Sequence, residues 1–150
     1  ALGPLSRQLR EAGYHITIET AGTRYLSVAC DLMSLSPKMS NSTPGEEHAP
    51  GWRERHDRWR HAPEVICRLI DEHPYQAKFV VGSRGDCDEV QAYLEQIPEI
   101  RRDRVMLMPL GTETSDLQRV GQWLEAYCRE HQLHFCPRRH IEWYGFRRGT

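Results

Sequence analysis

The stretch VMLMPLG, residues 105–111, decides the fold class of this 150-residue chain. It is a continuous apolar run that ends in proline and glycine. Such a run is typical of a strand that is buried on both faces, and such strands occur in parallel sheets covered by helices. The sequence on either side must therefore supply further strands and the helices that connect them.

Strand and helix patterns alternate along the rest of the chain. Three further strands are predicted at residues 15–19, 31–36 and 77–82. Helices are predicted before Gly13, after Pro63, around Val90 and over residues 112–131. Strands that alternate with helices indicate a parallel sheet with the helices packed outside it. A closed eight-stranded barrel needs roughly 200 residues or more, so the sequence predicts an α/β fold that is either part of a barrel or an open sheet.

Residues 37–61 interrupt this alternation with serine, proline, glycine and charge, and are predicted to be a long irregular loop. We interpret residues 1–150 as one domain that includes this loop, with Trp52 and Trp59 fixing part of it. The last residues, 133–150, alternate too loosely to assign an element.

Composition excludes several classes of protein. The formal net charge of −1 gives no sign of a broad nucleic-acid surface, and no apolar run of about 18 residues could span a membrane. The five cysteines are widely spaced and form no CxxC pair, which favours reduced thiols in a cytoplasmic protein over disulfides or a zinc site. The chain has eight histidines, whose protonation would make its net charge more positive at mildly acidic pH.

Polar residues follow each predicted strand, where ligands bind in parallel α/β folds. Glu19 could accept hydrogen bonds from the two hydroxyls of a ribose, but the pattern fits a turn or helix cap for Glu19 and Thr20 equally well. Lys38 could hold a carboxylate or phosphate, although a solvated loop lysine has the same pattern. Ser36 is typical of a turn unless Lys38 also binds a ligand.

Two further features each have a structural and a functional interpretation. His140 could hydrogen-bond a ligand or be an ordinary half-buried histidine. The segment RERHDRWRH, residues 53–61, is similar to a nucleic-acid contact patch, but its acidic residues favour a solvated loop. No GxGxxG or Walker-type loop is present, which disfavours a nucleotide-binding protein of another α/β family.

Four motifs together resemble one family. ETAGT at residues 19–23, SLSPK at 34–38, VMLMPLG at 105–111 and RRHIEWYGFRRGT at 138–150 occur in the order and with the gaps of the 7-carboxy-7-deazaguanine synthases, which are radical S-adenosylmethionine enzymes. The resemblance covers nearly the whole chain except residues 39–61. Each motif alone would be weak, whereas the ordered set is fairly specific.

The resemblance implies a partial (β/α) barrel and a lyase of queuosine biosynthesis, a tRNA modification pathway. Such enzymes convert 6-carboxy-5,6,7,8-tetrahydropterin to 7-carboxy-7-deazaguanine with S-adenosylmethionine, a [4Fe-4S] cluster and Mg²⁺. The resemblance also implies a reductant such as flavodoxin or ferredoxin and allows a homodimer. No direct contact with nucleic acid or a membrane is expected.

The resemblance also carries roles onto the matching positions, without assigning a catalytic residue. Contacts to S-adenosylmethionine are implied for seven residues: Glu19, Thr20, Thr23, Ser36, Lys38, Pro109 and Gly111. Pro109 and Gly111 would do so by bringing backbone close to the cofactor. Substrate contacts are implied for Thr23, Lys38 and His140.

The chain departs from the family in lacking three closely spaced cysteines. Since cluster ligation needs such thiolates, we expect the cluster and Mg²⁺ ligands to lie outside these residues. This predicts a C-terminal fragment that is inactive alone. The alternative is a nucleoside-binding or regulatory α/β module without catalysis.

Overall fold

The computed structural model describes residues 1–45, 47 and 51–146 and contains one parallel five-stranded sheet. The strands lie side by side in the order in which they occur in the sequence. They are β1 (Thr17–Thr20), β2 (Leu32–Leu35), β3 (Tyr75–Val81), β4 (Val105–Pro109) and β5 (His134–Phe135). The parallel sheet that the strand and helix alternation predicted is confirmed.

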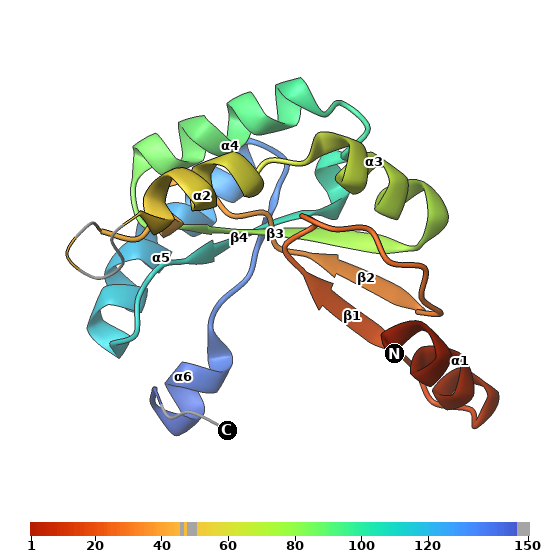
Figure 1. Ribbon diagram of the computed structural model, residues 1–150. Helices are drawn as coiled ribbons and strands as arrows, with labels where there is room; N and C mark the ends of the chain where they lie inside the picture. Colours follow the sequence, from red (N-terminus) through yellow and green to blue (C-terminus); the bar gives the residue numbers. More distant parts are fainter. Residues whose placement is uncertain (46, 48–50, 147–150) are drawn as a thin grey trace.

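Helices cover one face of this sheet (Figure 1). The α3 helix packs on β2, α4 packs on β3, and α5 packs on β4 and β5. The α-helices are α1 (Leu2–Glu11), α2 (Trp52–Trp59), α3 (Pro63–Glu72), α4 (Arg84–Gln96), α5 (Thr114–Glu130) and α6 (Arg139–Tyr144), with short 3-10 turns η1 (Ser40–Ser42) and η2 (Arg102–Arg104). The predicted outer helices are therefore present.

The core lies between the sheet and these outer helices. In β3 and β4 every second side chain is buried, and Phe79, Val81 and Leu107 are fully buried. The residues between them, such as Met106 and Met108, are only partly buried. The prediction that residues 105–111 are buried on both faces is therefore wrong, because the described elements cover only the helix side of β4.

The N-terminal helix α1 contacts the body through its small residues. The buried Ser6 hydroxyl accepts a hydrogen bond from the Ala29 backbone N–H at 3.0 Å and donates one to the Gly3 carbonyl oxygen at 2.9 Å. The leucines at helical spacing, Leu2, Leu5 and Leu9, are instead exposed. This amphipathic helix therefore presents its apolar stripe outward.

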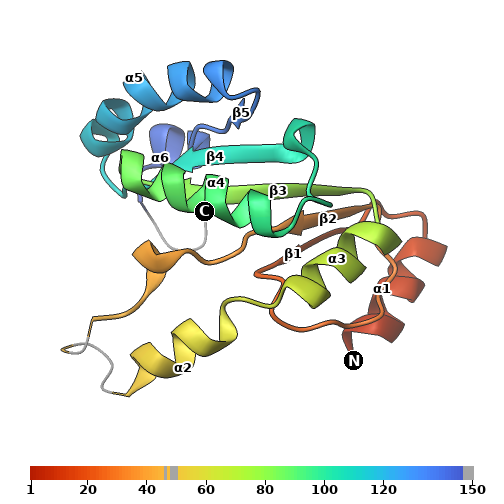
Figure 2. The same ribbon diagram turned by 90° about the horizontal axis from the view of Figure 1, so that it is seen from above.

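The sequence predicted that residues 37–61 are irregular, but this prediction is only partly correct. The segment contains η1 and the two-turn helix α2, although residues 46 and 48–50 lie outside the described part. Trp52 and Trp59 do not fix it to the core, since each is 54% exposed. Arg55 instead lies over both indole rings, 5.1 and 5.2 Å from their centres. Figure 2 shows α2 projecting from the rim of the sheet.

The C-terminal residues that the sequence left unassigned form β5 and α6. The β5 strand extends the sheet beside β4, and α6 lies on the side of the sheet opposite to α3 and α4 (Figure 1). Within the described residues β1 and β5 do not pair, so the curved sheet stays open. Residues 147–150 of the last family motif lie outside the described residues.

Candidate functional site

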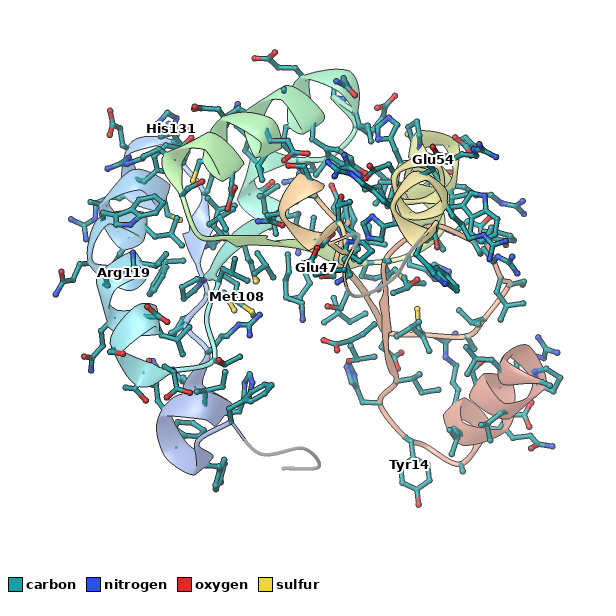
Figure 3. All side chains as sticks on the ribbon, turned by 60° about the vertical axis from the view of Figure 1, so that its left-hand side comes forward. Tyr14, Glu47, Glu54, Met108, Arg119 and His131 are labelled. Atoms are coloured by element: carbon teal, nitrogen blue, oxygen red, sulfur yellow. The ribbon has the colours of Figure 1, made fainter. Side chains whose placement is uncertain are left out.

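The face of the sheet opposite the outer helices carries polar side chains. Side chains alternate between the two faces of a strand, and the parallel register aligns Glu19 of β1 with Ser34 of β2 and Ser34 with Gln76 of β3. The Gln76 side-chain amide donates a hydrogen bond to the Ser34 hydroxyl at 3.1 Å. Figure 3 shows Met108 of β4 pointing into the hollow on this side, while Arg119 and His131 point outward from α5.

A cavity of about 580 Å³ occupies this hollow at the carboxyl ends of the strands. Its volume is in the range of pockets that hold a cofactor or a drug-sized ligand. The strands and their following loops supply most of the wall, and the C-terminal segment closes one side. The lining residues are Glu19, Thr20, Ala21, Ser36, Lys38, Lys78, Val80, Met108, Arg138 and His140.

An ion pair crosses the floor of the cavity between β1 and β3. The Lys78 ammonium donates a hydrogen bond to the Glu19 carboxylate at 2.6 Å. Lys78 is only 18% exposed, whereas the Glu19 side chain is 71% exposed and accessible to a ligand. The hydrogen bond and charge of Lys78 lower the pKa of Glu19, so this group is an anion at neutral pH.

Thr20 and Gly22 form the turn that follows β1. The Gly22 backbone N–H donates a hydrogen bond to the Thr20 hydroxyl at 3.1 Å. This is the turn role that the pattern allowed for Thr20, and the residue also lines the cavity. One short motif thus shapes the backbone and forms part of the wall.

Ser36 and Lys38 follow β2 on the same rim. The Lys38 ammonium lies 3.4 Å from the Ser36 hydroxyl, and both residues line the main cavity. Lys38 also borders a smaller apolar pocket against α2, which Thr23, Trp52 and Trp59 help to line. The structure therefore places Thr23 in this smaller pocket beside α2 and not in the main cavity. Lys38 borders both pockets.

The structure places the remaining predicted site residues unequally. His140 lines the cavity from α6. Pro109 points to the helix side of the sheet, where it borders a separate pocket with Leu117 and Phe135. Gly111 does not line the cavity, but its carbonyl oxygen accepts a hydrogen bond from Arg138 at 3.2 Å.

The cavity wall also contains two cations that the sequence did not predict, Lys78 and Arg138. Lys78 lies in the middle of β3, where buried and half-buried side chains alternate in the folded strand and place it on the cavity side. The letters KFVV themselves do not alternate in polarity, so the sequence carried no clear signal for it. Arg138 precedes α6 in a tail whose elements the sequence did not reveal, so it carried no comparable signal.

No group of three His, Cys, Asp or Glu side chains within the described residues could hold a metal ion. The five cysteines are free, and burial raises the pKa of the thiols of Cys87 to about 12 and of Cys128 to about 11. Protonated, separated thiols do not fit a [4Fe-4S] cluster, which needs clustered thiolates. The described residues therefore do not fit the cluster or Mg²⁺.

The helices of the described part are also too short or too polar to cross a bilayer.

Comparison with known proteins adds an independent observation. No family model matches the chain. The 7-carboxy-7-deazaguanine synthase of Rhodopirellula baltica is 40% identical over 144 residues, covering 95% of this chain and 56% of that protein. The protein of the same name from Halobacterium salinarum is 34% identical over 143 residues, covering 89% of this chain and 56% of its own length.

A solved structure shows the same fold. The crystal structure of QueE from Escherichia coli matches with a TM-score of 0.63 at 17% identity, covering 91% of this chain and 50% of that chain. The open parallel sheet is thus similar to half of a known structure. The resemblance predicted from the four motifs is confirmed: this chain is similar to 7-carboxy-7-deazaguanine synthases along nearly all of its own length and over 56% of theirs.

Proposed function

We propose that this chain forms the ligand-binding part of a 7-carboxy-7-deazaguanine synthase. In that reaction 6-carboxy-5,6,7,8-tetrahydropterin becomes 7-carboxy-7-deazaguanine, a precursor of queuosine. The observation that carries the proposal is the polar cavity, which gathers five of the motif-derived positions, Glu19, Thr20, Ser36, Lys38 and His140. These positions lie in a chain that is 40% identical to a synthase of that name.

The cavity residues would bind and orient S-adenosylmethionine, whose cleavage supplies the radical that starts the reaction. Glu19 is an exposed, ionised acceptor fixed by Lys78, which suits the two hydroxyls of a ribose. Ser36 and Lys38 form a second polar group on the same rim. His140 faces the cavity from α6 and would contact the pterin.

The cluster and Mg²⁺ are part of the proposal only as groups held elsewhere in the protein. The described residues offer no metal-binding group, so their part in the reaction is limited to binding the organic ligands. A flavodoxin or ferredoxin would supply electrons. The five free cysteines suit a cytoplasmic location.

Product formation by the protein expressed from its complete reading frame tests the proposal. The cluster is reconstituted under anaerobic conditions, and the pterin, S-adenosylmethionine, Mg²⁺ and a reductant are supplied. We expect 7-carboxy-7-deazaguanine by mass spectrometry, with none from the 150-residue chain alone. Failure of the complete protein to form it would reject the proposal.

A nucleoside-binding module without catalysis is the second candidate, favoured by a cavity that no described cysteine lines. Calorimetry with S-adenosylmethionine on the 150-residue chain separates the two. Micromolar binding without a cluster would favour the module, because the synthase proposal assigns much of the affinity to the cluster.

A further inference from the structure

Arg138 is a partly buried cation of the cavity wall. It lies between β5 and α6 and faces the same space as Lys38 and His140. Its Nη1 donates a hydrogen bond to the Gly111 carbonyl oxygen at 3.2 Å, which fixes the side chain on a neutral acceptor. Among the described residues it forms no ion pair.

Burial makes this lack of an anion significant. The Nε atom of Arg138 is buried and has no hydrogen-bond partner in the described part of the chain. Burial also lowers the pKa of the guanidinium, although arginine stays protonated at any physiological pH. The residue as a whole is only partly buried and lines the cavity, so its other N–H groups can reach a ligand there. A partly desolvated cation binds an anion more strongly than a fully hydrated one.

The other two cations of the cavity are less suited to this role. The Lys78 ammonium already pairs with Glu19. Lys38 is exposed to solvent and therefore hydrated. A guanidinium also presents a planar set of donors that matches a carboxylate, whereas an ammonium acts as a point charge.

We propose that Arg138 binds the carboxylate of the ligand that occupies this cavity. The inference rests on the proposed function for the identity of that ligand. Two ligands then offer a carboxylate: the amino-acid part of S-adenosylmethionine and the acid group of the 6-carboxypterin ring. Arg138 is thus a specificity-determining residue for the acid group of one of them.

Equilibrium binding to matched ligand pairs tests the assignment without requiring turnover. S-adenosylmethionine is compared with its decarboxylated form, and 6-carboxypterin, a stable analogue of the substrate, is compared with pterin. Both pairs are measured by calorimetry on the protein expressed from its complete reading frame, and on its Arg138→Gln and Arg138→Lys variants. Arg139→Gln is the matched control, because Arg139 is adjacent, exposed and outside the cavity wall.

We expect the unmodified protein and the Arg139→Gln variant to prefer the carboxylate member of one pair by about tenfold or more. Arg138→Gln should abolish that preference by weakening only the carboxylate ligand. The pair that loses its preference identifies the source of the carboxylate. Arg138→Lys keeps the charge without the planar donors and should retain only part of the preference, which provides a test if Arg138→Gln does not fold.

Two results would overturn the inference, and they differ in what else they reject. A carboxylate preference that survives in both Arg138 variants would reject the role of Arg138 and leave the proposed function intact. Dissociation constants weaker than about 1 mM for both carboxylate ligands in the unmodified protein would reject the proposed function together with the inference.

Discussion

Gly22 adopts a left-handed backbone conformation, with a φ of +71°, where the chain leaves β1 and passes α3. A Cβ atom at this position would overlap with Cδ1 of Ile66, a fully buried residue of α3. The ETAGT motif therefore has a steric requirement as well as a polar one. Its glycine allows the turn that leaves Glu19 and Thr20 facing the cavity.

Replacing Gly22 with alanine should destabilise the fold by more than the cost of its backbone conformation. Gly13 is the matched control, because its φ is +83° but a Cβ there would meet no atom within 4 Å. We expect Gly13→Ala to cost about 1 kcal/mol and Gly22→Ala about 1–3 kcal/mol more, measured by chemical denaturation. Equal losses would contradict the steric role of Ile66.

Glu19 should be required for turnover because its carboxylate faces the cavity. Glu19→Gln removes the charge but keeps the size of the side chain, and we expect product formation by the complete protein to fall at least about tenfold. Glu72→Gln is the control, since Glu72 also accepts from a cation, Arg68, but lies on α3 away from the cavity. Unchanged turnover in Glu19→Gln would remove Glu19 from the site.

Lys38→Ala tests the second polar group of the rim in the same assay. Lys38 lines the main cavity, and its loss should reduce turnover at least about tenfold while the absorbance of the cluster stays unchanged. An altered cluster spectrum would indicate a general structural effect. Turnover like that of the unmodified protein would show that Lys38 is an ordinary solvated loop lysine.

The α4 helix shows how one element is fixed to the rim of the sheet. Its N-terminus has a reciprocal capping box between Ser83 and Asp86. The Asp86 carboxylate also accepts hydrogen bonds from the Gly82 backbone N–H at 2.6 Å and from the Asn41 side chain at 2.9 Å. Asp86 therefore joins the end of β3, the start of α4 and the η1 turn.

Asp86 should make stability depend on acid pH. Burial alone would raise the pKa of its carboxyl, but the hydrogen bonds from Gly82, Asn41 and Ser83 outweigh it and lower the pKa. The stabilisation is complete above the pKa of the unfolded chain and is lost as pH falls through the lower folded pKa. Asp86→Asn should cost about 1 kcal/mol at neutral pH and flatten this acid loss in denaturation curves.

Asp88→Asn provides the control on the same helix, since Asp88 is exposed and makes no contact with the cap. It should change the free energy of unfolding little at any pH. An acid loss of stability that persists unchanged in Asp86→Asn would contradict the assignment.

At the scale of the whole molecule, apolar side chains are exposed at both edges of the open sheet. Leu2, Leu5 and Leu9 are exposed on α1 near β1, and Trp143 and Tyr144 are exposed on α6, which follows β5 in the chain. Exposed apolar patches of this kind are typical of interfaces. We therefore expect the 150-residue chain to associate with further copies of itself.

Size-exclusion chromatography over a range of concentrations measures this association. Leu5→Glu and Trp143→Glu should each shift the chain toward monomer by placing a charge in an apolar contact. Trp59→Glu is the control, because Trp59 is equally apolar but lies on α2 away from both edges. A monomer at all concentrations without any substitution would contradict the prediction.

The sequence by itself determined the order and type of the main elements, because strand and helix periodicities are local. It also gave the motif positions Glu19, Thr20, Ser36 and Lys38, since the carboxyl ends of parallel strands meet at one edge of a sheet. The sequence did not predict α2, β5 or α6, because these elements are short and their patterns of apolar residues are weak.

Only the tertiary structure decided which side of the sheet the ligand would face and which charges remain free there. The alternation along β3 and β4 turns Lys78 and Met108 toward the cavity and Pro109 away from it. Arg138 reaches the cavity because the chain between β5 and α6 lies on the side of the sheet opposite α3 and α4. Such contacts join residues far apart in the chain, so no local pattern could reveal them.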